Sequence, residues 1–97
     1  MNPTAPVLKR IGVLVTGRVQ GVGYRYFTED AANHFALTGW VSNRFDGSVE
    51  LEAQGEPLDI EELLARLRMG PPLSHVVDLR VNDLPTETGE RGFEIRY

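Results

Sequence analysis

The 97-residue sequence contains no cysteine, only two histidines and no long apolar run. Without cysteine the chain can form neither a disulfide, nor a thiolate metal site, nor a cysteine nucleophile. A membrane-spanning helix needs about 20 consecutive apolar residues, and the basic and apolar regions of a signal peptide are also missing. We therefore expect a cytoplasmic protein that uses no metal or other cofactor and no membrane.

Basic charge is also scarce. The chain carries 10 Lys and Arg against 14 Asp and Glu, for a net charge of −4. A general nucleic-acid binder needs a basic face, so no nucleic-acid partner is expected. One arginine among backbone amides can still act on an anion at close range, so a local anion site stays open.

What is present fits one compact domain. Hydrophobic residues make up 41% of the chain, and chains of this length rarely hold two cores. Residues 1–8 contain two prolines and no periodicity, which predicts a flexible leader before a single domain at 9–97. No exposed apolar helix face suggests an obligate dimer, so a monomer is expected.

Hydrophobic periodicity predicts five strands. They cover residues 9–16, 39–45, 48–54, 74–82 and 93–97. In the third strand Val49, Leu51 and Ala53 alternate with Glu50, Glu52 and Gln54, which predicts one buried and one wet sheet face. In the fourth, the side chains predicted to point inward are Val77, Leu79 and Val81. Asp46-Gly47 predicts a tight hairpin turn between the second and third strands.

Two helices are predicted between these strands. The first begins near Tyr24, ends at Thr38-Gly39 and has a helix-spaced stripe of Tyr24, Phe27, Ala31 and Phe35. The second runs from Pro57 to Gly70, with Ile60, Leu63, Leu64 and Leu67 in its core-facing stripe. The order β-α-β-β-α-β with right-handed crossovers predicts an α+β, ferredoxin-like sandwich: two helices on one face of an antiparallel sheet, with a short extra C-terminal strand.

A glycine-rich stretch at residues 17–25, GRVQGVGYR, joins the first strand to the first helix. No Ser, Thr, Asp or Asn is present there to cap the helix, so an anion could satisfy the free N–H groups while Arg25 in the first turn binds it. The stretch matches neither the dinucleotide nor the Walker pattern. The alternative is a structural turn whose glycines only relieve strain.

Asn43 is the second candidate. In the predicted topology the strands at 9–16 and 39–45 run parallel, so their carboxyl ends lie at the same sheet edge. Asn43 and the glycine-rich stretch therefore meet there. Asn43 shares the side-chain parity of Val41 and Phe45, which should face the helices. It is either an amide aimed at the anion or a structural asparagine that bonds loop backbone.

These stretches resemble the paired signature of the acylphosphatases. The resemblance covers residues 9–97 and includes GWVSNRFDGSVE at 39–50, Gly70-Pro71-Pro72 and Phe93-Glu94-Ile95. It implies metal-free hydrolysis of an acyl phosphate to a carboxylate and inorganic phosphate, with Arg25 binding phosphate and Asn43 positioning water. Tyr24 stands where Phe is frequent in the family. The backbone amides expected around the phosphate are those of Val19, Gln20, Gly21, Val22, Gly23 and Tyr24.

Two other functions occur on folds of this kind. A non-catalytic ferredoxin-like module could bind anions or regulate, although it would not need both Arg25 and Asn43. RNA binding on an open sheet uses aromatic residues of the first and third strands, and neither strand has one. His34 and His75 are isolated, and structural or surface roles are expected for them.

Overall fold

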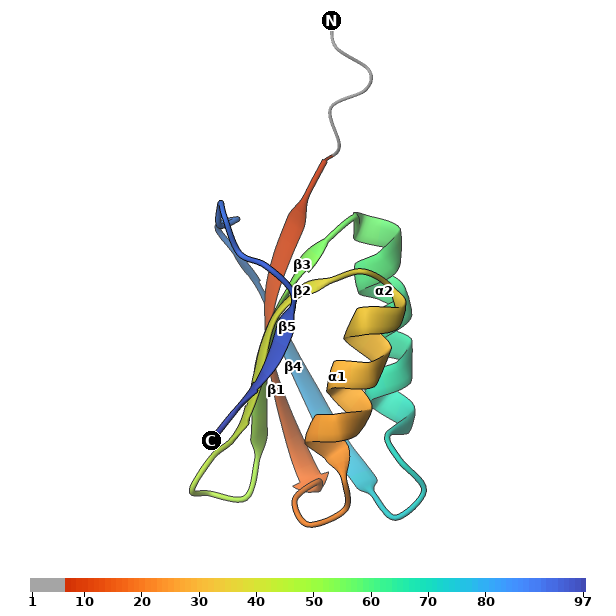
Figure 1. Cartoon of the computed structure of the whole chain (residues 1–97). Helices are drawn as coiled ribbons and strands as arrows, with labels where there is room; N and C mark the ends of the chain where they lie inside the picture. Colours follow the sequence, from red (N-terminus) through yellow and green to blue (C-terminus); the bar gives the residue numbers. More distant parts are fainter. Residues whose placement is uncertain (1–6) are drawn as a thin grey trace, which may run out of the picture.

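The computed structural model describes residues 7–97, so most of the predicted leader at 1–8 lies outside the described residues. The division into leader and domain stays a prediction. A five-stranded sheet carries both helices on one face (Figure 1). This confirms the ferredoxin-like α+β sandwich. Neither helix of the described part combines the length and apolar character needed to cross a membrane.

The elements follow the predicted order. They are β1 (Lys9–Arg18), α1 (Tyr24–His34), β2 (Thr38–Asn43), β3 (Val49–Gly55), α2 (Pro57–Met69), β4 (His75–Leu84) and β5 (Phe93–Arg96). Across the sheet the strands are ordered β4-β1-β3-β2-β5. β5 pairs parallel with β2, so the sheet is antiparallel except at this edge.

The core lies between the helices and one face of the sheet. The predicted stripe of α2 is confirmed, since Ile60, Leu63, Leu64 and Leu67 are all buried. The stripe of α1 is partly wrong: Phe27 and Phe35 are half-buried, and Thr28 and Ala32 are buried with Tyr24 and Ala31. Thr28 tolerates burial because its hydroxyl donates to the Tyr24 carbonyl at 2.9 Å.

Helix α1 ends four residues before the predicted stop. The Leu37 N–H bonds to the Ala32 carbonyl and the Ala36 N–H to that of Asn33, the pattern of a Schellman cap. Ala36 holds the left-handed position with φ 54°, where glycine is usual. The prediction at Thr38-Gly39 was wrong because an alanine, which gives no stop signal, closes the helix.

The sheet face opposite the helices, the outer face, is not uniformly exposed to solvent. Gln54 is buried, and Arg10, on the same face, is only 2% exposed. The connection between β4 and β5 covers them: Glu90 accepts from Arg10 Nη1 at 2.8 Å, and the Glu87 carbonyl accepts from Gln54 Nε2 at 2.8 Å. The connection between β4 and β5 therefore covers an ion-pair cluster around Arg10.

Strand β4 also departs from the simple alternation. Its pairing with β1 shifts register between Thr16 and Gly17. As a result Val77 is 68% exposed instead of inward, and Val76 packs against the core. Leu79 and Val81 lie opposite Val15 and Val13 and so share the helix face, although Val81 at this edge remains 38% exposed.

Candidate active site

The glycine loop, residues 19–23, leads from β1 into α1 at one end of the sheet (Figure 1). Val19 is 1% exposed and anchors the loop in the core. Gly23 precedes the helix with φ 80°, and no side chain caps the N-terminus of α1. The first N–H groups of the helix therefore remain available, next to the positive end of its dipole.

The glycines of this region have different roles. At Gly17 a Cβ atom would lie 2.1 Å from the His75 carbonyl oxygen, so close approach of β4 requires glycine there. At Gly21 and Gly23 a Cβ would meet nothing within 4 Å, but φ is positive at both. The structural interpretation thus holds for Gly17, whereas Gly21 and Gly23 present open backbone.

A cavity of about 200 Å³ lies against the loop. Its lining comes from the loop, the first turn of α1 and the end of β2: Val19, Gly21, Gly23, Tyr24, Arg25, Tyr26 and Asn43. Arg25 and Asn43, 18 positions apart in the sequence, thus face the same space. Of the residues expected around a phosphate, Gln20 and Val22 do not line this cavity.

Asn43 owes its position to strand register. It is the last residue of β2 and lies opposite Val49 of β3, which lies opposite Val15 of β1. Residues that are directly opposite share a face, so Asn43 lies on the helix side, in a row with two buried valines. The side-chain hydrogen bonds found within residues 7–97 do not include its amide.

Phe45 does not follow this parity. It is fully exposed, because β2 ends at Asn43 and the chain enters the β2–β3 turn, residues 44–48. This turn is longer than the predicted Asp46-Gly47 turn: the Arg44 N–H bonds to the Ser48 carbonyl at 2.9 Å, and the Gly47 N–H to the Arg44 carbonyl. Hydrogen bonds from Ser48 lower the pKa of Asp46 within the turn.

Arg25 is half-buried in the first turn of α1. Its guanidinium carbon lies 4.8 Å from the centre of the Tyr97 ring, and the ion pairs within residues 7–97 do not include it. A hydrogen bond with the Tyr26 hydroxyl raises the pKa of Tyr97. Tyr97 is not among the predicted site residues, although in the predicted strand at 93–97 its spacing from Phe93 and Ile95 puts all three on one face.

Tyr24 anchors the start of α1 to the second helix. Its side chain is 1% exposed, and its hydroxyl donates to the Leu67 carbonyl at 2.7 Å. Burial raises the pKa of this phenol. The hydroxyl that distinguishes Tyr24 from phenylalanine is therefore used in a buried hydrogen bond to α2.

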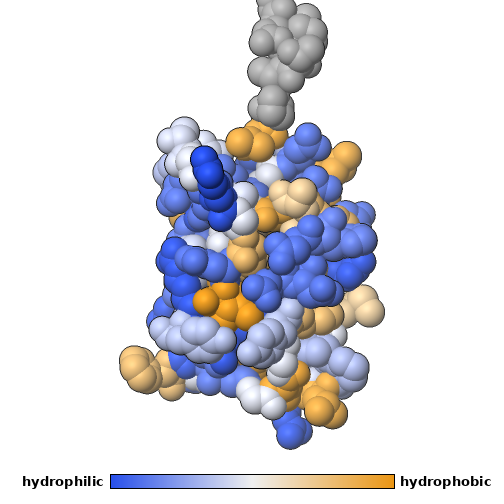
Figure 2. Space-filling view, in the orientation of Figure 1, coloured by the Kyte–Doolittle hydropathy of each residue, from blue (hydrophilic) through white to orange (hydrophobic). Residues whose placement is uncertain are grey.

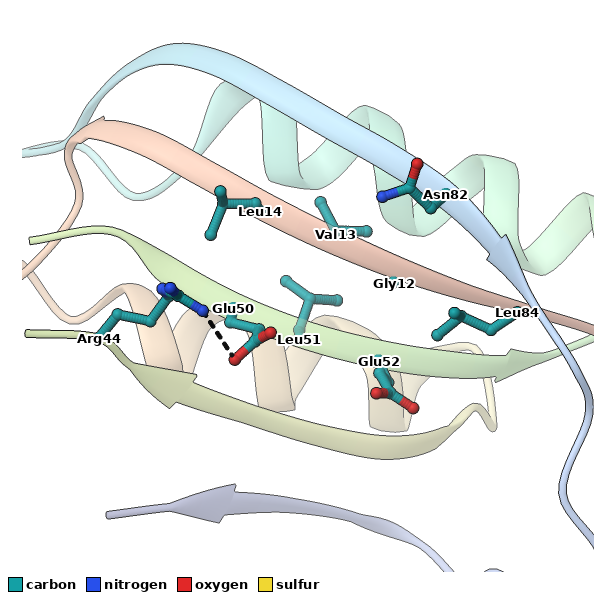
Figure 3. Close-up of a pocket in the computed structure, with 9 residues that line it drawn as sticks. All are labelled: Gly12, Val13, Leu14, Arg44, Glu50, Leu51, Glu52, Asn82 and Leu84. Carbon is teal, nitrogen blue, oxygen red and sulfur yellow. Dashed lines mark ion pairs between the residues drawn. The ribbon is translucent and has the colours of Figure 1, made fainter. Parts of the chain in front are cut away.

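Another hollow lies on the outer face of the sheet. It measures about 290 Å³, and its lining includes Gly12, Leu14, Glu50, Glu52 and Asn82. Figure 3 shows Arg44 reaching toward Glu50, with which it pairs at 3.5 Å. This face offers carboxylates and no aromatic platform in the hollow, in contrast to the sheets that stack RNA bases.

No three His, Cys, Asp or Glu side chains gather as metal ligands within residues 7–97. In Figure 2 hydrophilic side chains cover most of the view, and apolar ones are exposed in separate places. Among the residues that line the cavity, Arg25 carries a positive charge, and the loop and the start of α1 present backbone N–H groups.

A family model described as acylphosphatase matches residues 11–95. The chain is 44% identical over 91 residues to the acylphosphatase of Oceanobacillus iheyensis, across 93% of this chain and 100% of that protein. The crystal structure of acylphosphatase from Bacillus subtilis matches with a TM-score of 0.89 and 38% identity, covering 94% of this chain and 100% of that one. Full-length HypF in its phosphate- and nucleotide-bound form matches with a TM-score of 0.86 and 25% identity, covering 99% of this chain but 13% of HypF.

Proposed function

We propose a metal-independent mechanism of acyl phosphate hydrolysis for this chain, which belongs to the acylphosphatase family. The family makes it a hydrolase that converts an acyl phosphate into a carboxylate and inorganic phosphate. One observation carries the mechanism: Arg25, Asn43 and the glycine loop line the same cavity.

The phosphoryl group binds at the positive side of this cavity. Arg25 offers a planar fork to two phosphoryl oxygens, and no carboxylate of residues 7–97 competes for it as an ion-pair partner. The backbone N–H groups between Val19 and Tyr24 stabilise the charge on the equatorial oxygens. Phosphoryl transfer depends mainly on such positioning and charge stabilisation, so these groups can replace a metal.

The water molecule binds at Asn43, which orients it with the amide oxygen as acceptor. The water oxygen forms a bond to phosphorus, while the bond between phosphorus and the acyl oxygen breaks on the opposite side, in line with the attack. The carboxylate leaves with the electron pair and needs no proton, so a general acid is unnecessary. A phosphoryl oxygen takes the proton from the water, since the residues lining the cavity include no carboxylate or histidine.

The test is hydrolysis of synthetic acetyl phosphate by the purified protein, measured as the release of inorganic phosphate. We expect turnover that added phosphate inhibits competitively, because the cavity binds a tetrahedral anion. Phosphate binding without any turnover would instead support a non-catalytic anion-binding module. A cytoplasmic location and a monomeric state stay predictions, to be checked by fractionation and sedimentation.

A further inference from the structure

The side chain of Gln20 links the glycine loop to the β2–β3 turn. Its Nε2 donates to the Arg44 carbonyl at 2.7 Å and to the Ser48 carbonyl at 2.8 Å. A glutamine amide has two N–H donors, and both are used here on a segment more than 20 residues away. In the proposed mechanism Gln20 contributes only its backbone N–H, and its side chain has no part.

The two carbonyls that Gln20 contacts flank the position of Asn43. Arg44 follows Asn43 directly, and Ser48 precedes Val49, the residue opposite Asn43 in the β2–β3 ladder. The Arg44 N–H bonds to the Ser48 carbonyl at 2.9 Å. The Gln20 amide therefore binds both ends of the β2–β3 turn, next to Asn43 and Val49, the last pair of the ladder.

The β2–β3 turn has few other contacts of this kind. Arg44, Phe45, Asp46 and Gly47 are exposed, while Ser48 at the end of the turn is buried, and the hydrogen bonds within the turn join its own residues. The glycine loop is anchored at both ends, because Val19 is buried in the core and Gly23 is the N-cap of α1. The Gln20 side chain thus fixes the β2–β3 turn relative to the anchored glycine loop.

We infer that Gln20 is a positioning residue that holds Asn43, and the water bound to it, in register with the phosphate on the glycine loop. The inference rests on the proposed function of Asn43. Phosphate is bound by backbone amides and Arg25, so it does not depend on this link. Attack by water does, because a displacement of about 1 Å at a reacting group can lower the rate about 100-fold.

The experiment uses Gln20→Met, which keeps the length of the side chain and removes both donors. On acetyl phosphate we expect kcat to fall about 10- to 100-fold, while the inhibition constant of inorganic phosphate stays near the wild-type value. In the Asn43→Ala background the same substitution should have no further effect on kcat, because residues that act through one another are not additive.

Gln54→Met is the matched control. Gln54 also ties a strand to a distant segment, since its Nε2 donates to the Glu87 carbonyl at 2.8 Å, but it does so on the outer face beside Arg10. We expect it to lower the melting temperature and leave kcat near wild type. A fall in kcat as large as that of Gln20→Met would show that general loosening of the fold explains both, against the inference.

Other outcomes separate the two levels of the hypothesis. The inference about Gln20 is wrong, while the mechanism stands, if Gln20→Met keeps a normal kcat or weakens phosphate binding as much as it lowers kcat. It is also wrong if Gln20→Met lowers kcat by the same factor in the Asn43→Ala background as in the wild-type protein. If Asn43→Ala alone keeps a normal kcat, the proposed mechanism is wrong, and the inference that rests on it is wrong as well.

Discussion

The guanidinium of Arg25 lies 4.8 Å from the ring centre of Tyr97, so that the start of α1 is held against the residue that follows β5. Tyr26, in the same turn of α1, is the main group that raises the pKa of Tyr97. A cation over an aromatic face is stabilised by about 0.5–1 kcal/mol at exposed sites. This contact orients Arg25 without consuming any of its N–H donors.

Tyr97→Leu should therefore weaken phosphate binding. Losing about 0.5–1 kcal/mol of orientation corresponds to an inhibition constant roughly two- to fivefold higher. Tyr97→Phe keeps the ring and removes only the hydroxyl, and serves as the control. Competitive inhibition by phosphate measures both variants, and equal weakening by Leu and Phe would mean that the hydroxyl, and not the ring, supports Arg25.

The two central side chains should separate in their kinetics. Arg25→Gln removes a charged hydrogen bond worth about 1.5–3 kcal/mol and should weaken phosphate binding and lower turnover together. Asn43→Ala should keep much of the phosphate affinity while kcat falls on the order of 10²–10³-fold. Steady-state kinetics with phosphate inhibition constants measures the difference, after circular dichroism has shown that both variants fold. A folded Asn43→Ala protein with normal turnover would return Asn43 to a structural role.

Activity should survive removal of metal ions. The proposed mechanism takes all its positive charge from Arg25 and backbone N–H groups. Exhaustive dialysis against EDTA followed by the acetyl phosphate assay should leave kcat unchanged. Loss of activity that Mg²⁺ restores would overturn the mechanism, whereas loss that no metal restores would point to damage of the protein.

Acid should weaken the cluster around Arg10. The hydrogen bond from Arg10 lowers the pKa of Glu90 below its ordinary value of 4.5. A carboxyl group whose pKa is lower in the folded state stabilises the protein fully above its unfolded pKa, and this contribution is lost as the pH falls through the folded pKa. Glu90→Gln should lower the free energy of unfolding by about 1.5–3 kcal/mol at pH 7, and the difference should shrink below about pH 4.

Urea unfolding at pH 7 and pH 3 measures this effect. Glu94→Gln is the control, because Glu94 pairs with Arg96 at 2.9 Å in an exposed position. Exposed pairs contribute about 0–1 kcal/mol. If Glu90→Gln costs no more than Glu94→Gln at pH 7, the Arg10 cluster does not stabilise the fold through Glu90.

Much of this protein could be predicted from local sequence. The order of the elements, the core stripe of α2 and the uncapped start of α1 depend on spacing and residue type within one segment, which the sequence displays directly. The proximity of the glycine loop and Asn43 could also be predicted, because the topology alone brings the carboxyl ends of β1 and β2 to one edge of the sheet. Identifying Arg25 and Asn43 as candidates needed no side-chain geometry.

The tertiary structure decided what depends on contacts between distant segments. Arg10 and Gln54 have the parity of a wet face, yet a later connection covers them and supplies Glu90 and Glu87 as partners. Tyr97 meets Arg25, and Gln20 meets the β2–β3 turn, through polar or aromatic side chains whose partners no periodicity specifies. Alternation tells which face a residue occupies, but what lies over that face is set only when the whole chain has packed.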